Sequence, residues 1–548
     1  MKLFNKKPII ILLILSLLLS LSGCGNNKEE VIGDNDISAH LGGNIKTIDP
    51  SLCSDSDGMT FIVQCFEGLM TVDNTGNLVC GQAKDYHVSK DGLTYTFTLK
   101  NNLQWSDGKK VTAHDFVYSW KRLVDPATAS SYNYLLEMVK NANDVMNGKM
   151  DTKGLGIKAL SDTTLQIYLE YPCSYFLEIC AFPSTVPLRA DIVNRYPDWA
   201  NSTKNYVVNG PFKLTEWTRD YKMVLKPNDN YYARANVRPS KVDLHLISKD
   251  NTVLSAFNTG DLHIGSLIPT AELPNLKGKG LVTESSLGNY YLSVNVNVDP
   301  SVAEVQKNKA LLDKRVRRAL SLAIDREYIV KNVTQGGQLP ADTFIPPSVQ
   351  KDANGNDLYN SLEKWWDNTT YKENCEEARN LIKETGLNPD DIIVEFAYNS
   401  EGGHKDIAEA VQNMWSKELG ITATCRNEEW QVFQDTRNNG KFQIARNGWL
   451  ADYHDALTFS TLMTSGNGNN NSFYTNPEYD ALIEKAAKVT GAEYDKAIIA
   501  AEKILKEDAP VIPIYFYTSS YLKASNIKGI FTHMNHIYFK NAYLQEGN

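Results

Sequence analysis

The chain has 548 residues, of which 42% are hydrophobic and 22% charged, and its formal net charge at pH 7 is −9. This apolar fraction can form large buried cores, so the composition excludes wholesale disorder, and the length corresponds to about three or four domains. The acidic balance argues against a nucleic-acid partner, because a phosphate backbone needs cationic side chains.

The N-terminus carries the only apolar run that could enter a bilayer. Three lysines precede Ile9–Leu21, which is almost entirely aliphatic but shorter than the about 20 residues that a membrane-spanning helix needs. The pattern therefore predicts a signal peptide over residues 1–23. It ends in Leu21-Ser-Gly-Cys24, which resembles a bacterial lipobox and predicts lipidation of Cys24; an ordinary secretory signal with a chance cysteine is the alternative. Residues 24–36 are polar and predict a flexible tether.

Period-two alternation of apolar residues predicts strands over Asp91–Lys100, Thr164–Glu170 and Phe212–Leu225. Between the first two, Thr112 followed by Asp115 three residues later indicates the N-terminus of a helix.

Helical spacing dominates the second half of the chain. The pattern predicts a long helix over Ser301–Val333, and amphipathic helices over Cys375–Thr385 and Asp406–Leu419 that close near Gly386 and Gly420. A further helix is expected over Ala492–Lys506 and a buried strand over Val511–Tyr517. Mixed strands and helices without a strict alternation indicate α/β layers in several domains.

Motifs for catalysis or cofactor binding are missing from the sequence. It contains no GxSxG elbow, no phosphate-binding loop, no dinucleotide fingerprint and no HExxH motif. His533 and His536 form an HxxH pair without a nearby third ligand, and the seven cysteines after Cys24 show no CxxC spacing, which favours scattered buried thiols. No cofactor or metal is therefore expected, and an enzyme is the minority hypothesis.

Several aromatic residues stand beside turn residues rather than inside periodic segments. Their placement suits a concave small-molecule site at a domain interface, with simple core packing as the alternative. The residues are Trp430, Trp449, Tyr453, Tyr515 and Tyr517.

An ordered set of short motifs extends over nearly the whole chain after the tether. The motifs are Ile48–Pro50, Phe66–Leu69, Asp91–Phe97, Trp105–Gly108, Val111–Trp120, Asn209–Leu214, Arg315–Leu320, Ala323–Arg326 and Pro510–Tyr515. In this order they resemble the extracytoplasmic solute-binding proteins of peptide ABC importers, bacterial solute-binding protein family 5. The resemblance implies a monomeric receptor without a cofactor, held at the extracytoplasmic face of the cell membrane by its lipid, that captures short peptides and delivers them to ABC permease subunits.

The family's fold is α/β and three-lobed, similar to type II periplasmic binding proteins, with two lobes that close on the ligand by a hinge. By analogy, the chain crosses between lobes I and III near Tyr291–Asn295 and Tyr515–Ser520. The implied lobes are lobe I (37–66 with 191–291 and 519–548), lobe II (67–190) and lobe III (292–518).

The resemblance also implies ligand residues at the two ends of a bound peptide. Asp452, in the stretch Arg446–Tyr453, corresponds to the residue that binds the α-ammonium group; a turn or capping aspartate is the alternative. Arg437, Arg446 and His404 correspond to positions that receive the C-terminal carboxylate, directly or through water. A structural salt bridge is the alternative for each arginine.

The middle of the peptide has its own implied contacts. Trp430 and Trp449 correspond to residues that line side-chain pockets, and Tyr134 and Tyr517 to tyrosines that touch the peptide. Backbone contacts are expected from Asn447, Gly448 and Trp449 and from Ser54 to Ser56, because strand edges satisfy a peptide main chain regardless of its sequence.

The sequence departs from the family pattern at four positions. Ser54 replaces an acid of well-known relatives, Thr334 replaces a lysine, and Gly288 and Leu450 occupy positions of a disulfide.

A receptor of the same fold for a nickel chelate, an oligosaccharide or a cell-wall peptide is the alternative function. Asp452 discriminates, because a sugar or a metal chelate has no α-ammonium group. An envelope enzyme is the least favoured of these functions.

Overall fold

The computed structural model describes residues 35–43, 45–299, 301, 307, 309–400 and 402–545. The predicted signal peptide, Cys24 and nearly all of the tether lie outside these residues. Within the described part of the chain, no helix combines the length and the apolar character that crossing a membrane requires.

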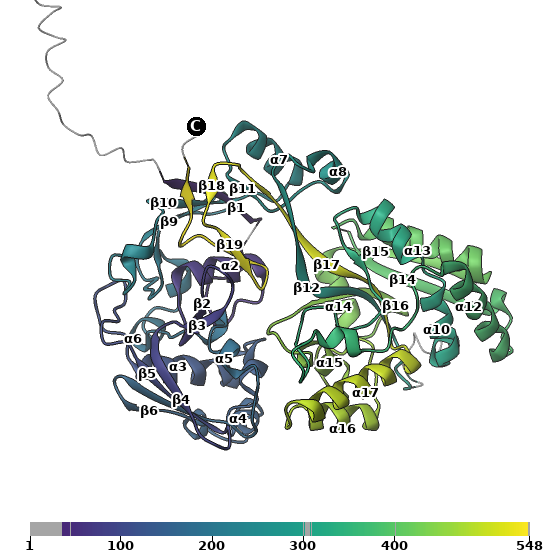
Figure 1. Cartoon of the computed structure of the whole chain (residues 1–548), viewed down its shortest axis with the longest axis horizontal. Coiled ribbons are helices and arrows are strands. Elements are labelled where there is room, and N and C mark those ends of the chain that lie inside the picture. The colour runs from purple at the N-terminus through teal and green to yellow at the C-terminus, as the bar shows by residue number, and fades with distance from the viewer. Residues whose placement is uncertain are drawn as a thin grey trace, which may run out of the picture.

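One large mixed sheet runs through the molecule and joins its two halves (Figure 1). Two long antiparallel strands at its centre, β12 and β17, pass from one half to the other and pair from Leu281 opposite Leu522 to Ser293 opposite Val511. In sheet order the strands are β15 (Thr422–Glu428), β14 (Ile393–Asn399), β16 (Ile444–Leu450), β12 (Leu281–Val294), β17 (Val511–Lys523), β11 (Ile264–Gly265), β1 (Asp36–Gly42), β10 (Lys241–Leu246), β9 (Lys222–Pro227) and β8 (Phe212–Thr218), and β13 (Leu339–Pro340) pairs with β17.

A second, antiparallel sheet lies in residues 83–193, which we call the small-sheet part. Its strands, in sheet order, are β4 (Ala83–Val88), β5 (Thr94–Leu99), β7 (Thr164–Tyr168) and β6 (Ile157–Ser161). The expected helix start is confirmed: α3 spans Ala113–Val124, and the Asp115 carboxylate accepts a hydrogen bond of 2.8 Å from the Thr112 backbone N–H. The strands expected around residues 91–100 and 164–170 are confirmed as β5 and β7.

Residues 309–508, which we call the helical part, carry six described helices of nine residues or more. They are α10 (Lys314–Leu322), α12 (Tyr371–Thr385), α13 (His404–Leu419), α14 (Trp430–Asn438), α16 (Pro477–Ala486) and α17 (Ala492–Asp508). Gly386 and Gly420 end α12 and α13 in the left-handed region, with φ of 74° and 71°, as predicted from the sequence.

Two predicted elements differ from the structure. The long helix expected over Ser301–Val333 is broken, because the side chains of Asp313 and Asp325 accept backbone N–H bonds and start new helices, α10 and α11 (Arg326–Tyr328). The single strand expected over Phe212–Leu225 is a hairpin of β8 and β9, turned at Asp220, which has φ of 53°.

The remaining α-helices and strands of the described chain are connected by loops and short 3₁₀ helices. They are α2 (Ser56–Cys65), β2 (Met70–Val72), β3 (Leu78–Cys80), α4 (Ala142–Met146), α5 (Phe176–Ile179), α6 (Ala190–Val193), α7 (Asp250–Thr259), α8 (Leu273–Leu276), α15 (Leu457–Ser460), β18 (Ile527–Lys528), β19 (Phe531–His533), β20 (His536–Tyr538) and β21 (Tyr543–Leu544), with a π-helix at Ile329–Thr334.

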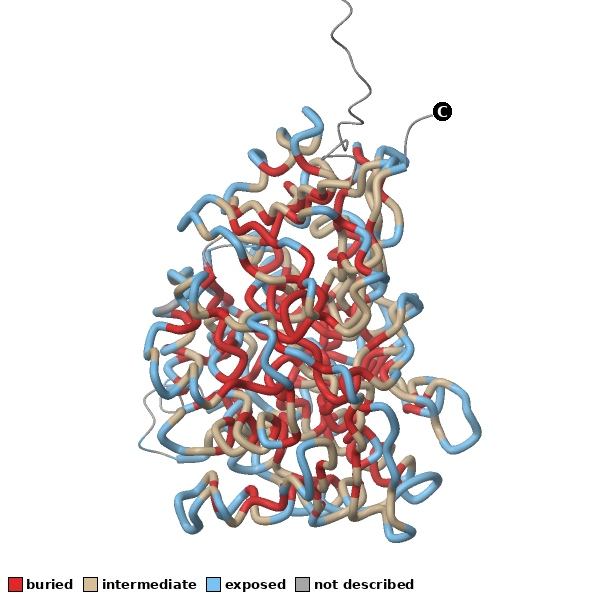
Figure 2. The backbone as a smooth tube through the Cα atoms, turned by 90° about the vertical axis from the view of Figure 1, so that its left-hand side faces the viewer, coloured by how far each residue is buried: buried red, intermediate tan, exposed pale blue. Residues whose placement is uncertain are grey.

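Buried residues fill the interior and exposed ones the periphery (Figure 2). Trp105, Trp120 and Trp415 are completely buried. The seven cysteines of the described residues are free, and five of them are buried, which confirms the expectation of scattered thiols.

Candidate functional site: a cavity between the two halves

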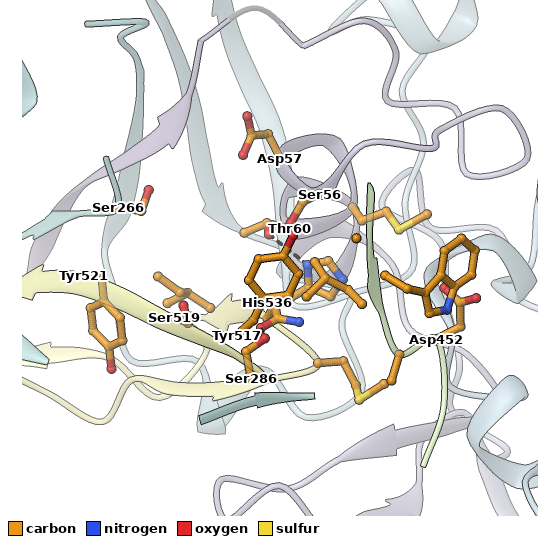
Figure 3. A pocket seen from close by; sticks show the side chains of 18 of the residues that line it. Ser56, Asp57, Thr60, Ser266, Ser286, Asp452, Tyr517, Ser519, Tyr521 and His536 are labelled. Carbon is orange, nitrogen blue, oxygen red and sulfur yellow. Dashed lines mark hydrogen bonds between the residues drawn. The ribbon is translucent and has the colours of Figure 1, made fainter. Parts of the chain in front are cut away.

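A cavity of about 680 Å³ opens where the two halves meet (Figure 3). Its walls come from segments far apart in the sequence: the start of α2, the end of β16, the middle of β17 and the hairpin of β19 and β20. Asp452 lies at one end of the view, Ser266 and Tyr521 lie at the other, Tyr517 and His536 lie between them, and Asp57 lies above Ser56. The enclosure suits an elongated small ligand.

Strand pairing sets one wall of the cavity. Gly448 in β16 pairs with Tyr290 in β12, which in turn pairs with Tyr515 in β17. A side chain at Gly448 would collide with the Tyr517 hydroxyl group, so this position needs glycine for the strand and the tyrosine to stay in contact. Gly448 and Tyr517 therefore line the cavity side by side.

Asp452 follows directly after β16. Its Oδ2 accepts a hydrogen bond of 2.7 Å from the Tyr134 hydroxyl group, which reaches across from the small-sheet part. Burial raises the pKa of Asp452 to about 7, and the Tyr134 hydrogen bond opposes this shift only in part. No cationic side chain of the described residues forms an ion pair with it. The site therefore holds a carboxylate that lacks a positive partner.

Two arginines supply the opposite charge. Arg437 donates to Asn447 Oδ1 at 2.7 Å and to Gln434 Oε1 at 2.6 Å, and Arg446 donates to Asn399 Oδ1 at 2.6 Å. Among the described residues neither guanidinium forms an ion pair with a carboxylate, and both lie over the Phe433 ring. Burial lowers the pKa of Arg437 to about 10, and its Nε has no hydrogen-bond partner.

His404 lies at the start of α13, near Arg446. Its ring stacks on Tyr290 with centroids 5.6 Å apart, and Nδ1 is 3.3 Å from the Tyr290 hydroxyl oxygen. Burial, and then the charge of Arg446, lower the pKa of His404 to about 3. The imidazole is therefore neutral at physiological pH and can offer a hydrogen bond but not a charge.

The expected site residues divide into two groups. Those that line the cavity are Ser54, Ser56, Trp430, Arg446, Gly448, Trp449, Asp452 and Tyr517. Four do not line the cavity: Tyr134, His404, Arg437 and Asn447. Tyr134 and Asn447 hydrogen-bond to the lining residues Asp452 and Gly448, whereas Arg437 contacts Asn447 and His404 contacts Tyr290. Tyr515 is buried and stacks on Tyr290, so core packing explains that aromatic residue.

Other lining residues were not expected from the sequence. His536 lines the cavity, and its Nδ1 is 2.9 Å from Thr60 Oγ1 in α2. Asp57 lines it as well, and burial, followed by the charge of Asp55, raises the pKa of Asp57 to about 6. The HxxH pair was the one available signal for the hairpin, but its spacing indicated nothing about a cavity. Only the fold brings β20 against α2.

The positions noted as a disulfide site in relatives face one another here. Gly288 in β12 pairs with Leu450 in β16 across the antiparallel ladder. This pair stands at the entrance to the Asp452 turn, where β12 and β16 stay joined by backbone hydrogen bonds without a covalent link.

Close contacts join the small-sheet part to the helical part beside the cavity. The rings of Tyr175 and Tyr453 stack with centroids 3.9 Å apart and planes at 5°. Ser174 Oγ donates to Asp455 Oδ2 at 2.8 Å, and the His454 backbone N–H donates to Glu178 Oε2 at 2.7 Å. The four residues from Asp452 to Asp455 thus bridge the two parts, so the structure is closed over the cavity.

Comparisons with known proteins agree on one family. The model of the bacterial extracellular solute-binding proteins, family 5 (middle region), matches residues 77–471. The oligopeptide-binding protein OppA of Bacillus subtilis is 35% identical over 98% of this chain and 99% of that protein. The periplasmic murein peptide-binding protein MppA of Escherichia coli is 32% identical over 89% of each chain. The structure of Haemophilus influenzae OppA in complex with the peptide RPPGFSPFR superposes with a TM-score of 0.80 at 29% identity, covering 94% of this chain and 99% of that one.

Proposed function

Because this chain belongs to family 5 of the bacterial extracellular solute-binding proteins, we propose that its cavity holds a short peptide with the α-ammonium group on Asp452 and the carboxylate toward Arg446 and Arg437. The chain is the extracytoplasmic substrate-binding receptor of an ABC importer and captures short peptides. Members of this family are receptors rather than enzymes, and we propose that this chain likewise releases its ligand unchanged.

The peptide assignment rests on one observation: an acidic side chain and two basic side chains of the site each lack a partner of opposite charge. Asp452 has no cation and the two arginines have no carboxylate among the described residues. Charges left without partners in a partly buried site are costly. A zwitterionic peptide supplies both missing partners at once, whereas an oligosaccharide supplies neither. We therefore favour peptides over the other ligands known for this fold.

Replacing Arg446 with glutamine should weaken binding of peptides with a free C-terminus by about 1–3 kcal/mol, because a charged hydrogen bond to the carboxylate is lost. Peptides with a C-terminal amide should bind the variant and the unchanged protein alike. Isothermal titration with a matched acid and amide pair measures this. An equal loss for acid and amide would contradict the role of Arg446 in recognising the carboxylate.

The contacts that hold the small-sheet part against the helical part should contribute to affinity, although their residues do not touch the peptide. Ser174 does not line the cavity, and its hydroxyl group reaches Asp455. Ser174→Ala should weaken every peptide by about 0.5–1.5 kcal/mol, since only the closed form makes this hydrogen bond. Ser161→Ala, in β6 of the same small-sheet part, is the control and should bind normally. A peptide-dependent effect of Ser174→Ala would contradict this role.

The organisation into lobes is part of the proposal. We place the hinge in the crossings at Tyr291–Asn295 and Tyr515–Ser520, where β12 and β17 connect the two halves. Lobe I (37–66, 191–291, 519–548), lobe II (67–190) and lobe III (292–518) then move as separate bodies.

We also propose that Cys24 carries a lipid anchor and that the receptor acts as a monomer beside its permease. The lipobox-like stretch before Cys24 supports the anchor. Cys24→Ser should move the protein from the membrane fraction to the soluble fraction, which cell fractionation and immunoblotting measure.

A further inference from the structure

A side chamber of about 280 Å³ adjoins the cavity at Asp452. Phe182, Asp452, Met534 and His536 line both spaces, so the chamber continues from the cavity rather than standing apart from it. Its remaining walls come from the β2–β3 hairpin, the segment after α5 and the β19–β20 hairpin. Its volume is several times the about 30 Å³ that one water molecule occupies in the liquid, and it can hold one large side chain.

The chamber walls are mostly apolar or uncharged. Val72, Leu78, Ala181 and Pro183 contribute carbon surface. His533 and His536 have pKa values of about 4, lowered by burial and then by a neighbouring histidine, so both are neutral. Glu178 is already bound to His454, whose Nδ1 lies 3.1 Å from Glu178 Oε2. The chamber therefore favours a large apolar or aromatic group over a charged one.

The position of Asp452 determines which part of a peptide reaches the chamber. An α-ammonium group hydrogen-bonded to this carboxylate places the first Cβ atom about 5 Å away. Two other spaces meet at Asp452. The cavity must take the rest of the peptide chain, and a groove beyond Tyr134 is lined by the acidic residues Glu137, Asp480 and Glu484. The chamber is the apolar space within reach of the first side chain.

We propose that this side chamber receives the side chain of the first peptide residue and selects peptides that begin with an aromatic or long aliphatic residue. The inference depends on the proposed role of Asp452, which fixes the N-terminus of the peptide at the mouth of the chamber. Apart from Asp452, none of the residues that line the chamber is among the site residues expected from the sequence.

A peptide series tests the chamber directly. Tripeptides X-Ala-Ala, with glycine, alanine, leucine, phenylalanine, tyrosine or lysine as X, are titrated into the full mature protein. Phenylalanine and leucine should bind at least tenfold more tightly than glycine, because their side chains leave water. A flat series, or one led by lysine, would overturn the proposal.

Two variants that fill the chamber test whether the chamber itself causes the preference for a large first side chain. In Leu78→Trp and Ala181→Phe the preference for phenylalanine over glycine should fall below twofold, while Gly-Ala-Ala binds within twofold of the unchanged protein. Val79→Trp is the matched control, because Val79 is the next residue of β3, is exposed and does not line the chamber. Preserved selectivity in both filled variants would also overturn the proposal.

Ala-Ala-Ala and its N-acetylated form distinguish this inference from the proposed function. If Ala-Ala-Ala binds and the acetylated form does not, a flat series rejects the chamber alone. If neither binds, or if both bind equally, the placement of the N-terminus on Asp452 is wrong and the chamber assignment fails with it.

Discussion

Asp452→Asn should weaken binding of unmodified peptides by about 2–5 kcal/mol, the cost of leaving a desolvated charge without its partner. The substitution keeps the shape of the side chain and an acceptor for the Tyr134 hydroxyl group, so it removes charge with little change in packing. Acetylating the peptide N-terminus should weaken binding to the unchanged protein by a similar amount. Calorimetric titration of both peptides with both proteins gives a double-mutant cycle in which the two losses should not add.

Asp57→Asn provides the control for a general charge effect. Asp57 is a second carboxylate that lines the same cavity, on the first turn of α2. Its replacement should change affinity far less than that of Asp452, and by the same factor for free and acetylated peptides. If Asp57→Asn and Asp452→Asn weaken binding equally, or if acetylated and free peptides bind alike, Asp452 does not hold the α-ammonium group.

The same Asp452→Asn substitution should stabilise the unliganded protein at pH 8 by about 2–4 kcal/mol. The folded state raises the pKa of Asp452 to about 7, because burial disfavours the charged form. Below about pH 4 the carboxyl group is protonated in both the folded and the unfolded chain and costs nothing. As the pH rises through 4 to 7, the unfolded chain ionises while the folded one resists, so stability falls.

Thermal unfolding of the two proteins without ligand, measured from pH 4 to pH 8, checks this linkage. The melting temperatures should agree at pH 4 and separate in favour of the variant as the pH rises to 8. Other groups titrate in both proteins, so only the difference between them reports on Asp452. Glu502, whose pKa burial also raises to about 7, titrates identically in both. A variant that is less stable at pH 8 would contradict an unpaired, desolvated carboxylate.

Together, the two results would show that Asp452 lowers the stability of the unliganded receptor and strengthens peptide binding. Without a ligand, burial disfavours the charged form of Asp452, and Arg446 and Arg437 have no carboxylate partner in the described chain. A bound peptide would relieve both, so ligand binding should raise the melting temperature of the natural protein more than that of Asp452→Asn.

Local patterns in the sequence predicted several of the regular elements. The alternation of apolar residues in β5 and β7, the Thr112 and Asp115 pair at α3, and the glycines after α12 and α13 act over a few residues, so a short stretch contains their whole cause. The elements that were predicted wrongly have local causes as well. Asp313 and Asp325 interrupt the helical spacing of residues 301–333 because their carboxylates can cap a new helix.

The order of the motifs along the chain was enough to predict the family, the fold and the capture of peptides, because those features are properties of the whole sequence. The sequence also singled out Asp452 and the two arginines as candidate ligand residues. It could not show whether a salt bridge already satisfied each arginine, because that depends on which side chains the fold brings within reach.

Tertiary structure alone decided the environment of those residues. Tyr134 meets Asp452 although 318 positions separate them, and that contact sits in a buried place that moves the carboxyl pKa toward 7. The side chamber joins the β2–β3 hairpin, the turn after α5 and the C-terminal hairpin, which share no sequence pattern. Burial and charge pairing depend on contacts between distant segments, so the sequence by itself determined the candidates and the fold determined their chemistry.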